Sequence, residues 1–191
     1  MQQASRIVVS MLLLITTHGC SRLTVTDPNA LYFVPPPGSQ VVVKQRLEVP
    51  PGMTRVYLQH GKVIPKSARN DYAVNCNFEI NTVSDAPRHI EPGEYIVSRS
   101  QRRTDSIVGL EPVRVASLVS SMMERDGGTP LMFEELRFTL TATSPSDLRE
   151  LACRGVMSFP AEIVPPTLAE MRRALGDYAE IRVPGEISLL H

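Results

Sequence analysis

The chain has 191 residues, and its 20 Lys and Arg balance its 20 Asp and Glu, so the formal net charge is zero. This balance excludes the broad electrostatic attraction by which basic proteins approach nucleic acid or anionic membranes. A hydrophobic fraction of 42% is too high for a disordered chain, and the length suits one compact domain. The sequence therefore predicts a folded protein that recognises any partner through local features.

The N-terminal residues have the order of a secretory signal peptide. Arg6 supplies the positive charge, and an apolar run from Ile7 to Ile15, interrupted by Ser10, follows it. A helix of this length rises only about 13 Å, whereas the hydrocarbon core of a bilayer is roughly 30 Å thick. We therefore expect residues 1–19 to be a signal peptide that is removed on export.

The apolar run ends at Thr17-His18-Gly19-Cys20. Small residues before a cysteine at this place resemble the bacterial lipobox, in which the cysteine is diacylated and becomes the new N-terminus. The resemblance implies fatty acids such as palmitate on Cys20, and a membrane-anchored tether over residues 20–39. The alternative is a conventional signal peptide with a cysteine close behind it by chance.

The sequence contains three cysteines, and an odd count in an exported protein leaves one to explain. If Cys20 carries lipid, Cys76 and Cys153 remain as a pair in an oxidising compartment. The chain-entropy model gives such a disulfide roughly 4 to 5 kcal/mol of stabilisation. The alternative is two buried free thiols.

Alternating apolar and polar residues predict a single β-rich domain over residues 40–191. The clearest strand runs from Tyr72 to Asn81 and directs Cys76 into the core. A turn at His60 and Gly61 separates two shorter strands. The other expected strands cover residues 41–49, 55–59, 62–64, 95–97, 113–118, 136–142 and 178–183, with a further edge strand at 31–34 and a loop at 124–129.

Two helices are expected near the C-terminus. Ser144 is placed to cap a helix from Pro145 to Cys153, which would let the disulfide fasten a helix to the sheet. A second helix over 168–175 begins with the capping-box pair Thr167 and Glu170. The expected fold class is α+β, with a mainly antiparallel β-sheet, either a sandwich or a partly closed barrel, and two short C-terminal helices.

Few residues have the spacing that catalysis or metal binding requires. Of the four histidines only His60 and His89 are placed to matter, and no zinc-binding or nucleophile-elbow motif occurs. Glu134 and Glu135 are interpreted as solvated surface carboxylates. The sequence thus predicts no catalytic residue, no metal ligand and no cofactor.

The basic run of Arg99, Arg102 and Arg103 is the one charge cluster that suggests a contact surface. These guanidinium groups are candidates for binding an acidic partner or lipid headgroups. The alternative is a solvated loop or strand end, since Glu94 and Asp105 lie nearby.

The layout resembles a group of uncharacterised proteobacterial lipoproteins. The matching segments are Tyr32 to Val49, Arg55 to Gly61, Tyr72 to Ile80, Leu151 to Cys153 and Leu168 to Tyr178. The resemblance implies a membrane-anchored envelope lipoprotein and supplies no activity. Ser21 after the anchor, where Asp would retain an enterobacterial lipoprotein in the inner membrane, implies the inner leaflet of the outer membrane, facing the periplasm.

The expected function is a non-enzymatic binding or scaffolding role, with an envelope protein as partner and no nucleic acid. Two alternatives stay open. A periplasmic hydrolase would assemble its site from dispersed residues, with His60 or His89 within about 3 Å of a serine or carboxylate. A carrier of small apolar ligands would have an apolar cavity inside the sheet.

Overall fold

A computed structural model describes residues 25–106, 130–142 and 146–187. Its strands are β1 (Gln40–Val43), β2 (Leu47–Val49), β3 (Arg55–Gln59), β4 (Lys62–Ile64), β5 (Asn75–Ile80), β6 (Arg88–Ile90), β7 (Gly93–Ser106), β8 (Met132–Ala142), β9 (Leu148–Arg154) and β10 (Ala179–Arg182). The helices are α2 (Leu168–Leu175) and α3 (Pro184–Ile187), with short 3-10 turns at Lys66–Ala68 and Gly176–Tyr178.

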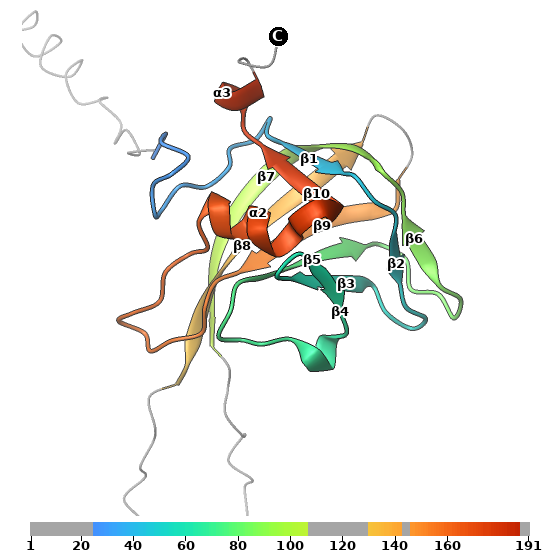
Figure 1. The fold of residues 1–191 in the computed structure, drawn as a ribbon, viewed down its shortest axis with the longest axis horizontal. Helices are drawn as coiled ribbons and strands as arrows, with labels where there is room; N and C mark the ends of the chain where they lie inside the picture. Colours follow the sequence, from blue (N-terminus) through green and yellow to red (C-terminus); the bar gives the residue numbers. More distant parts are fainter. Residues whose placement is uncertain (1–24, 107–129, 143–145, 188–191) are drawn as a thin grey trace, which may run out of the picture.

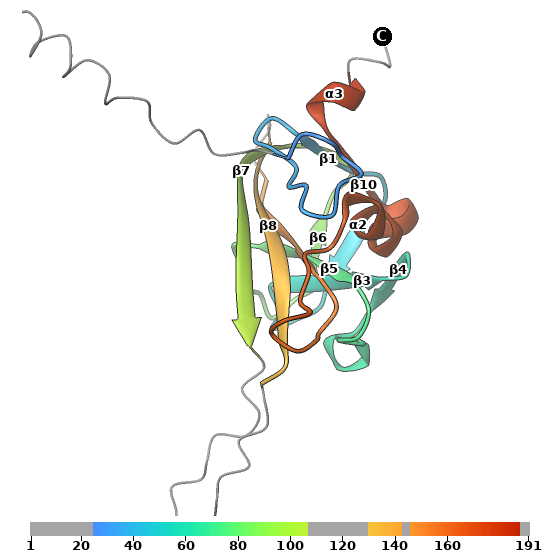
Figure 2. The same cartoon turned by 90° about the vertical axis from the view of Figure 1, so that its left-hand side faces the viewer.

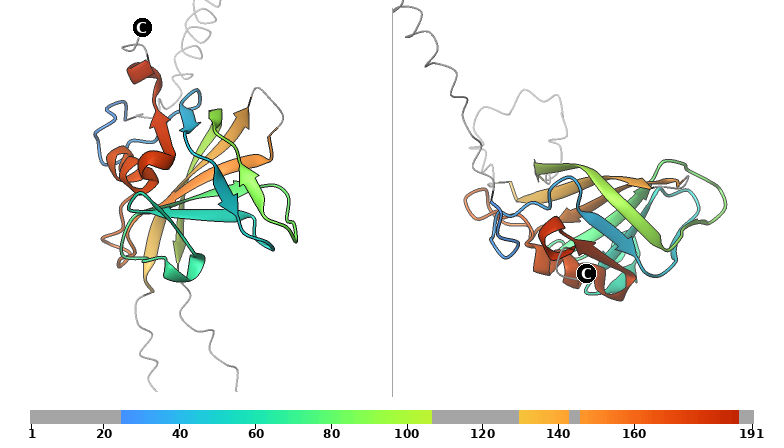
Figure 3. Two further views of the ribbon diagram at one scale, coloured as in Figure 1. Left: turned by 45° about the vertical axis from the view of Figure 1, so that its right-hand side comes forward. Right: turned by 90° about the horizontal axis from the view of Figure 1, so that it is seen from above.

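Eight strands form one antiparallel sheet in the order β10-β1-β7-β8-β9-β5-β3-β4, and β2 pairs with β6 in a second, small sheet (Figure 1). The large sheet curls into a half-barrel (Figure 3). Helix α2 contacts β3, β5 and β10, so it packs across the open side of the curl. The expected mainly antiparallel β fold is confirmed.

The core lies between the concave face of the half-barrel and α2. Leu58, Cys76, Cys153 and Leu136 stand opposite one another in register on β3, β5, β9 and β8, and all are fully buried. Met171 of α2 is fully buried as well. At roughly 1.5 to 3 kcal/mol for each large apolar side chain removed from water, this row and its neighbours supply most of the driving force for folding.

The stretch expected over residues 41–49 is divided between two sheets. β1 pairs with β10 and β7, whereas β2 pairs with β6. The chain bends at Lys44, whose amide donates to the carbonyl of Tyr178 at 2.8 Å. The expected edge strand at 31–34 was wrong: these residues form a turn, and Phe33 is buried in the core.

The expected helix from Pro145 to Cys153 was also wrong, because residues 148–154 form β9. Leu148 and Leu151 both point into the core at a spacing of three, as on a helix. Here the cause is a β-bulge: Ile80 of β5 stands opposite Leu148 while Glu79 stands opposite Glu150, which leaves Arg149 as an extra residue. One of the two expected C-terminal helices is therefore a strand, and the disulfide joins two strands.

Helix α2 agrees with the sequence. Thr167 and Glu170 form the complete capping box, and the helix ends at Gly176 with φ 56°. The turn between β3 and β4 is also confirmed, with φ 52° at His60 and 70° at Gly61. This hairpin docks on the end of α2, since the Gly61 amide donates to the Ala174 carbonyl at 3.1 Å. The capped helix therefore holds one margin of the half-barrel.

The strands expected at 95–97 and 136–142 are the centres of β7 and β8, which extend well beyond them, and the strand expected at 178–183 is β10. The strand expected at 113–118 and the loop at 124–129 lie outside the described residues, as does Cys20. Within the described ranges, no helix is both long and apolar enough to cross a membrane.

Candidate interaction surface

The distal half of β7 is an open sheet edge. β1 pairs with β7 only over Gly93–Ile96, and the Val97 amide then donates to the Ser39 carbonyl at 2.8 Å. From Ser98 to Ser106, β8 is the only strand of the described chain that pairs with β7. Figure 2 shows this part of β7 along the margin of the sheet. Backbone groups on its outer side are available to a further strand.

A β-bulge at Ser98 decides which side chains face outward. Val97 stands opposite Leu140 and points into the core, whereas Arg99 stands opposite Thr139. The extra residue shifts the alternation by one position, so odd-numbered residues face the core before the bulge and the convex side beyond it. The convex face carries Arg99, Gln101, Arg103 and Asp105, and the concave face carries Ser100, Arg102 and Thr104.

Strand alternation divides the basic run between these faces, and the bulge before it decides which arginines face outward. Arg102 lies on the concave face, where its Nη2 donates to Glu134 Oε1 at 2.7 Å. Its guanidinium carbon also lies 5.2 Å from the centre of the Tyr32 ring. Arg102 is therefore occupied within the molecule. Beside it, Ser100 Oγ donates to the Pro35 carbonyl at 2.5 Å, so the N-terminal segment is held against the concave face.

Arg99 and Arg103 lie exposed on the convex face. Neither has an ion-pair partner within the part of the chain that the structure describes. Glu135 stands directly opposite Arg103, but Arg137 Nε donates to its carboxylate at 3.1 Å. The open edge thus presents two solvated cations, and the exposed Asp105 follows them.

The centre of the convex face is arranged differently, since its carboxylates are paired. Glu79 binds Arg55 at 2.8 Å and also binds Arg149. Arg137 bridges Glu135 and Glu150, each at 3.1 Å. Glu134 and Glu135 are only 4% exposed, so their interpretation as solvated carboxylates was wrong. The alternating charges of Glu135 and Arg137 were the available signal.

Burial perturbs this network electrostatically. Burial raises the pKa of Glu150, and the charge of Arg137 does not fully offset it because Glu79 also repels the ionised form. Burial lowers the pKa of Arg154, with help from the charge of Arg69. The Arg154 guanidinium carbon stacks 3.7 Å from the centre of the Phe133 ring. Desolvation of this kind accompanies a tightly packed ionic cluster.

The two histidines line separate pockets. His89 lines a cleft of about 490 Å³, and its Nε2 lies 3.9 Å from Oε2 of Glu48, which is not part of the cleft lining. His60 lines a smaller pocket of about 200 Å³ beside Glu170, whose carboxylate is bound in the capping box. Among the described residues neither histidine is hydrogen-bonded to a serine or a carboxylate, and no group of three or more His, Cys, Asp or Glu is placed to bind a metal ion.

An apolar groove of about 380 Å³ lies at the β4 margin, where Met53 and Val63 are exposed by 43% and 42%. It opens at the surface and not inside the curl. The concave face itself is occupied by core side chains, including the fully buried Phe78 and Phe138.

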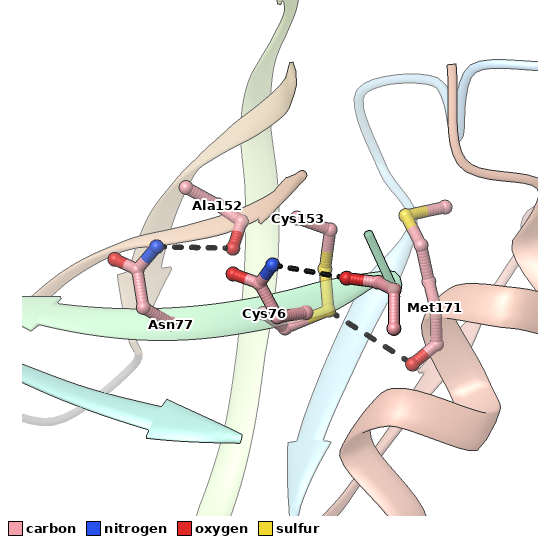
Figure 4. Close-up of a disulfide and its surroundings, with 7 residues drawn as sticks. Cys76, Asn77, Ala152, Cys153 and Met171 are labelled. Atoms are coloured by element: carbon pink, nitrogen blue, oxygen red, sulfur yellow. Dashed lines mark hydrogen bonds between the residues drawn. A yellow bond between two sulfur atoms is a disulfide. The ribbon is translucent and has the colours of Figure 1, made fainter. Parts of the chain in front are cut away.

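The cysteine pair forms a disulfide that links β5 to β9 within the core (Figure 4). Cys76 and Cys153 are directly opposite in register, with their Cα atoms 4.0 Å apart. The Cys76 Sγ also lies 3.9 Å from the carbonyl oxygen of Met171, so the bridge contacts α2. The disulfide therefore stabilises the place where sheet and helix meet.

Comparison with known protein families, with curated proteins and with solved structures found no match.

Proposed function

We propose that the chain is an exported lipoprotein, anchored in the bacterial envelope by acyl chains on Cys20, with a non-enzymatic binding or scaffolding role. Its binding surface is the open edge of β7. The anchor places the domain in the periplasm, at the inner leaflet of the outer membrane.

The observation that supports this proposal most directly is the Cys76–Cys153 disulfide. Stable disulfides are typical of proteins in oxidising compartments, so the bridge supports export from the cytoplasm. Pairing Cys76 with Cys153 leaves Cys20 as the remaining cysteine of the sequence. A cysteine directly behind an apolar export segment is the position at which lipidation occurs.

The open edge supports the binding role. A strand edge with free backbone groups binds an extended segment by adding it to the sheet, and flanking side chains decide which segment fits. Arg99 and Arg103 would favour a segment that brings a carboxylate to this edge, because opposite charges across a strand pair attract each other. Arg102 takes no direct part, since Glu134 and Tyr32 occupy it.

Lipidation is tested by expressing the full precursor in a bacterium fed with an alkyne-labelled fatty acid. We expect the wild-type protein to carry the label and to appear in the membrane fraction. The Cys20→Ala variant should be unlabelled and absent from that fraction. A Cys76→Ala and Cys153→Ala variant is the matched control, because it loses two thiols and keeps the acylated one. Unlabelled wild-type protein with an uncut leader in the cytosol would overturn the proposal.

Binding is tested by photo-crosslinking in intact cells with a crosslinking amino acid at position 103. We expect discrete adducts with an envelope protein, and none from the same amino acid at the exposed position 66, outside β7. Turnover of a substrate library by the purified protein would contradict the non-enzymatic role.

A further inference from the structure

We propose that the occupant of the β7 edge is a second copy of this chain, paired antiparallel over Ser98–Ser106 about a two-fold axis at Arg102. This deepens the proposed binding role and rests on it, since it names the partner of the same edge. The two curled sheets would join into one continuous sheet.

The charges of the edge are self-complementary in this arrangement. A two-fold axis perpendicular to the sheet keeps the convex faces on one side, so residues of that face meet one another across the pair. With the axis at Arg102, Arg99 stands opposite the partner's Asp105, and Asp105 opposite the partner's Arg99. Gln101 stands opposite the partner's Arg103. On the convex face, each opposed pair is therefore either oppositely charged or an arginine against an amide.

In neighbouring registers the charges of the two strands would make the pair less stable. An axis at Gln101 sets Arg99 against the partner's Arg103, and an axis at Arg103 sets that residue against its own copy. Like charges directly opposite destabilise a strand pair. An axis at Thr104 pairs Arg103 with the partner's Asp105, but it uses only the last part of the described edge. The Arg102 axis alone combines opposite charges with the whole edge.

Arg102 itself meets its copy on the concave face at the axis. The repulsion there is reduced because each Arg102 is already paired with Glu134, which is only 4% exposed. Ser100 stands opposite the partner's Thr104, which gives two hydroxyl pairs beside the axis. No proline occurs from Ser98 to Ser106, so the backbone amides that point away from β8 are all able to donate.

The arrangement also agrees with a shared membrane anchor. The N-terminal segment contacts the concave face through Pro35 at Ser100 and Tyr32 at Arg102. The two-fold axis keeps both concave faces on one side of the joined sheet, so both N-terminal segments start there. Two chains anchored in one leaflet also meet at a high effective concentration.

The test is the dimer dissociation constant of the mature lipoprotein in detergent, measured by analytical ultracentrifugation. We expect Asp105→Arg to weaken the dimer by about tenfold or more, because Arg then faces Arg twice. The double variant Arg99→Asp with Asp105→Arg restores the opposite charges and should return the constant to within about threefold of wild type. Asp85→Arg, at an exposed position outside β7, is the matched control and should leave dimerisation unchanged.

Three results would overturn the dimer: a wild-type protein that stays monomeric, an Asp105→Arg variant that dimerises as wild type does, or rescue by Arg103→Asp instead of Arg99→Asp. The crosslinking test separates this from the proposed function. Adducts from position 103 to another envelope protein in a monomeric chain would retain the binding role and reject self-pairing. The absence of any adduct from β7, with dimers also absent, would reject both.

Discussion

The centre of the sheet and the distal half of β7 present the same kinds of residue in opposite states. At β5 and β9, arginines and carboxylates are paired with one another around Glu79 and Glu150. In β7 beyond the bulge, Arg99 and Arg103 have no ion-pair partner among the described residues. In the described part of the chain, the central strands have a neighbouring strand on each side, whereas distal β7 has one on a single side.

The difference separates what stabilises the domain from what is available to a partner. Charges that are already paired and partly buried have lost their hydration and gain little from a new contact. At the β7 edge, by contrast, the solvated charges and the unpaired backbone groups can both still bind a partner. Substitutions at the centre should therefore change the free energy of unfolding, and those at the edge should change association.

The largest expected effect comes from removing the disulfide. The bridge spans a sequence separation of 77, so the double variant Cys76→Ala and Cys153→Ala should lose about 4 kcal/mol of unfolding free energy. Urea denaturation of the mature protein measures the loss. Arg103→Ala is the comparison at the edge and should stay within about 0.5 kcal/mol of wild type. Equal midpoints for the two variants would contradict the distinction.

Gly176 tests the second attachment of the centre, where α2 meets the β3–β4 turn. A Cβ at Gly176 would lie 2.4 Å from the Gly61 Cα, and φ there is +56°. Gly176→Ala should therefore cost about 2 to 4 kcal/mol, as strain and overpacking add. Gly52→Ala is the matched control, since φ is +70° but nothing lies within 4 Å of its Cβ. It should cost only about 1 kcal/mol, and an equal loss at both positions would show that close packing at Gly176 contributes nothing.

Much of the centre was predictable because its signals are local. The capping box at Thr167, the turn at His60 and Gly61, and the alternation around Cys76 each fix a structure within a few residues. The two bulges were not predictable, because an extra residue is revealed only by its partner strand. The bulge at Arg149 imitated a helical spacing, and the one at Ser98 turned Arg99 outward and Arg102 toward the core side. The basic run predicted a contact surface at the distal half of β7. Asp105 was considered in that prediction only because its charge opposes the arginines.

Glu79 and Asp105 provide a direct comparison of a central with an edge carboxylate. Glu79→Gln keeps the shape but removes the charge that binds Arg55 and Arg149, so we expect a loss of about 1 to 3 kcal/mol. Burial lowers the pKa of Arg55, yet the hydrogen bond and charge of Glu79 more than offset this, so its pKa lies above the usual value. Asp105→Asn should change stability by less than about 0.5 kcal/mol. Thermal unfolding of both variants measures the contrast, and a larger loss at Asp105 would reverse it.

The smallest effect is a pH dependence within the centre. Burial raises the pKa of Glu150, so the folded chain binds a proton more readily there than the unfolded chain does. Between the unfolded pKa and the raised folded pKa, stability from this group therefore falls as the pH rises. Glu150→Gln imitates the protonated form, and it should remove this slope and gain less than about 1 kcal/mol at neutral pH.

Glu180 supplies the control of opposite sign. The hydrogen bond from Lys44 lowers its pKa, with burial opposing and Arg182 assisting. Its contribution is present above the unfolded pKa and disappears as the pH falls through the lowered folded pKa. The test is the unfolding free energy measured from pH 3 to 8. Relative to wild type, Glu150→Gln should lack a contribution that falls with rising pH, and Glu180→Gln should lack a contribution that rises with it. If the two lost contributions have the same sign, burial does not dominate the pKa of Glu150. The centre would then stabilise its ionised carboxylates as fully as the sheet margin does.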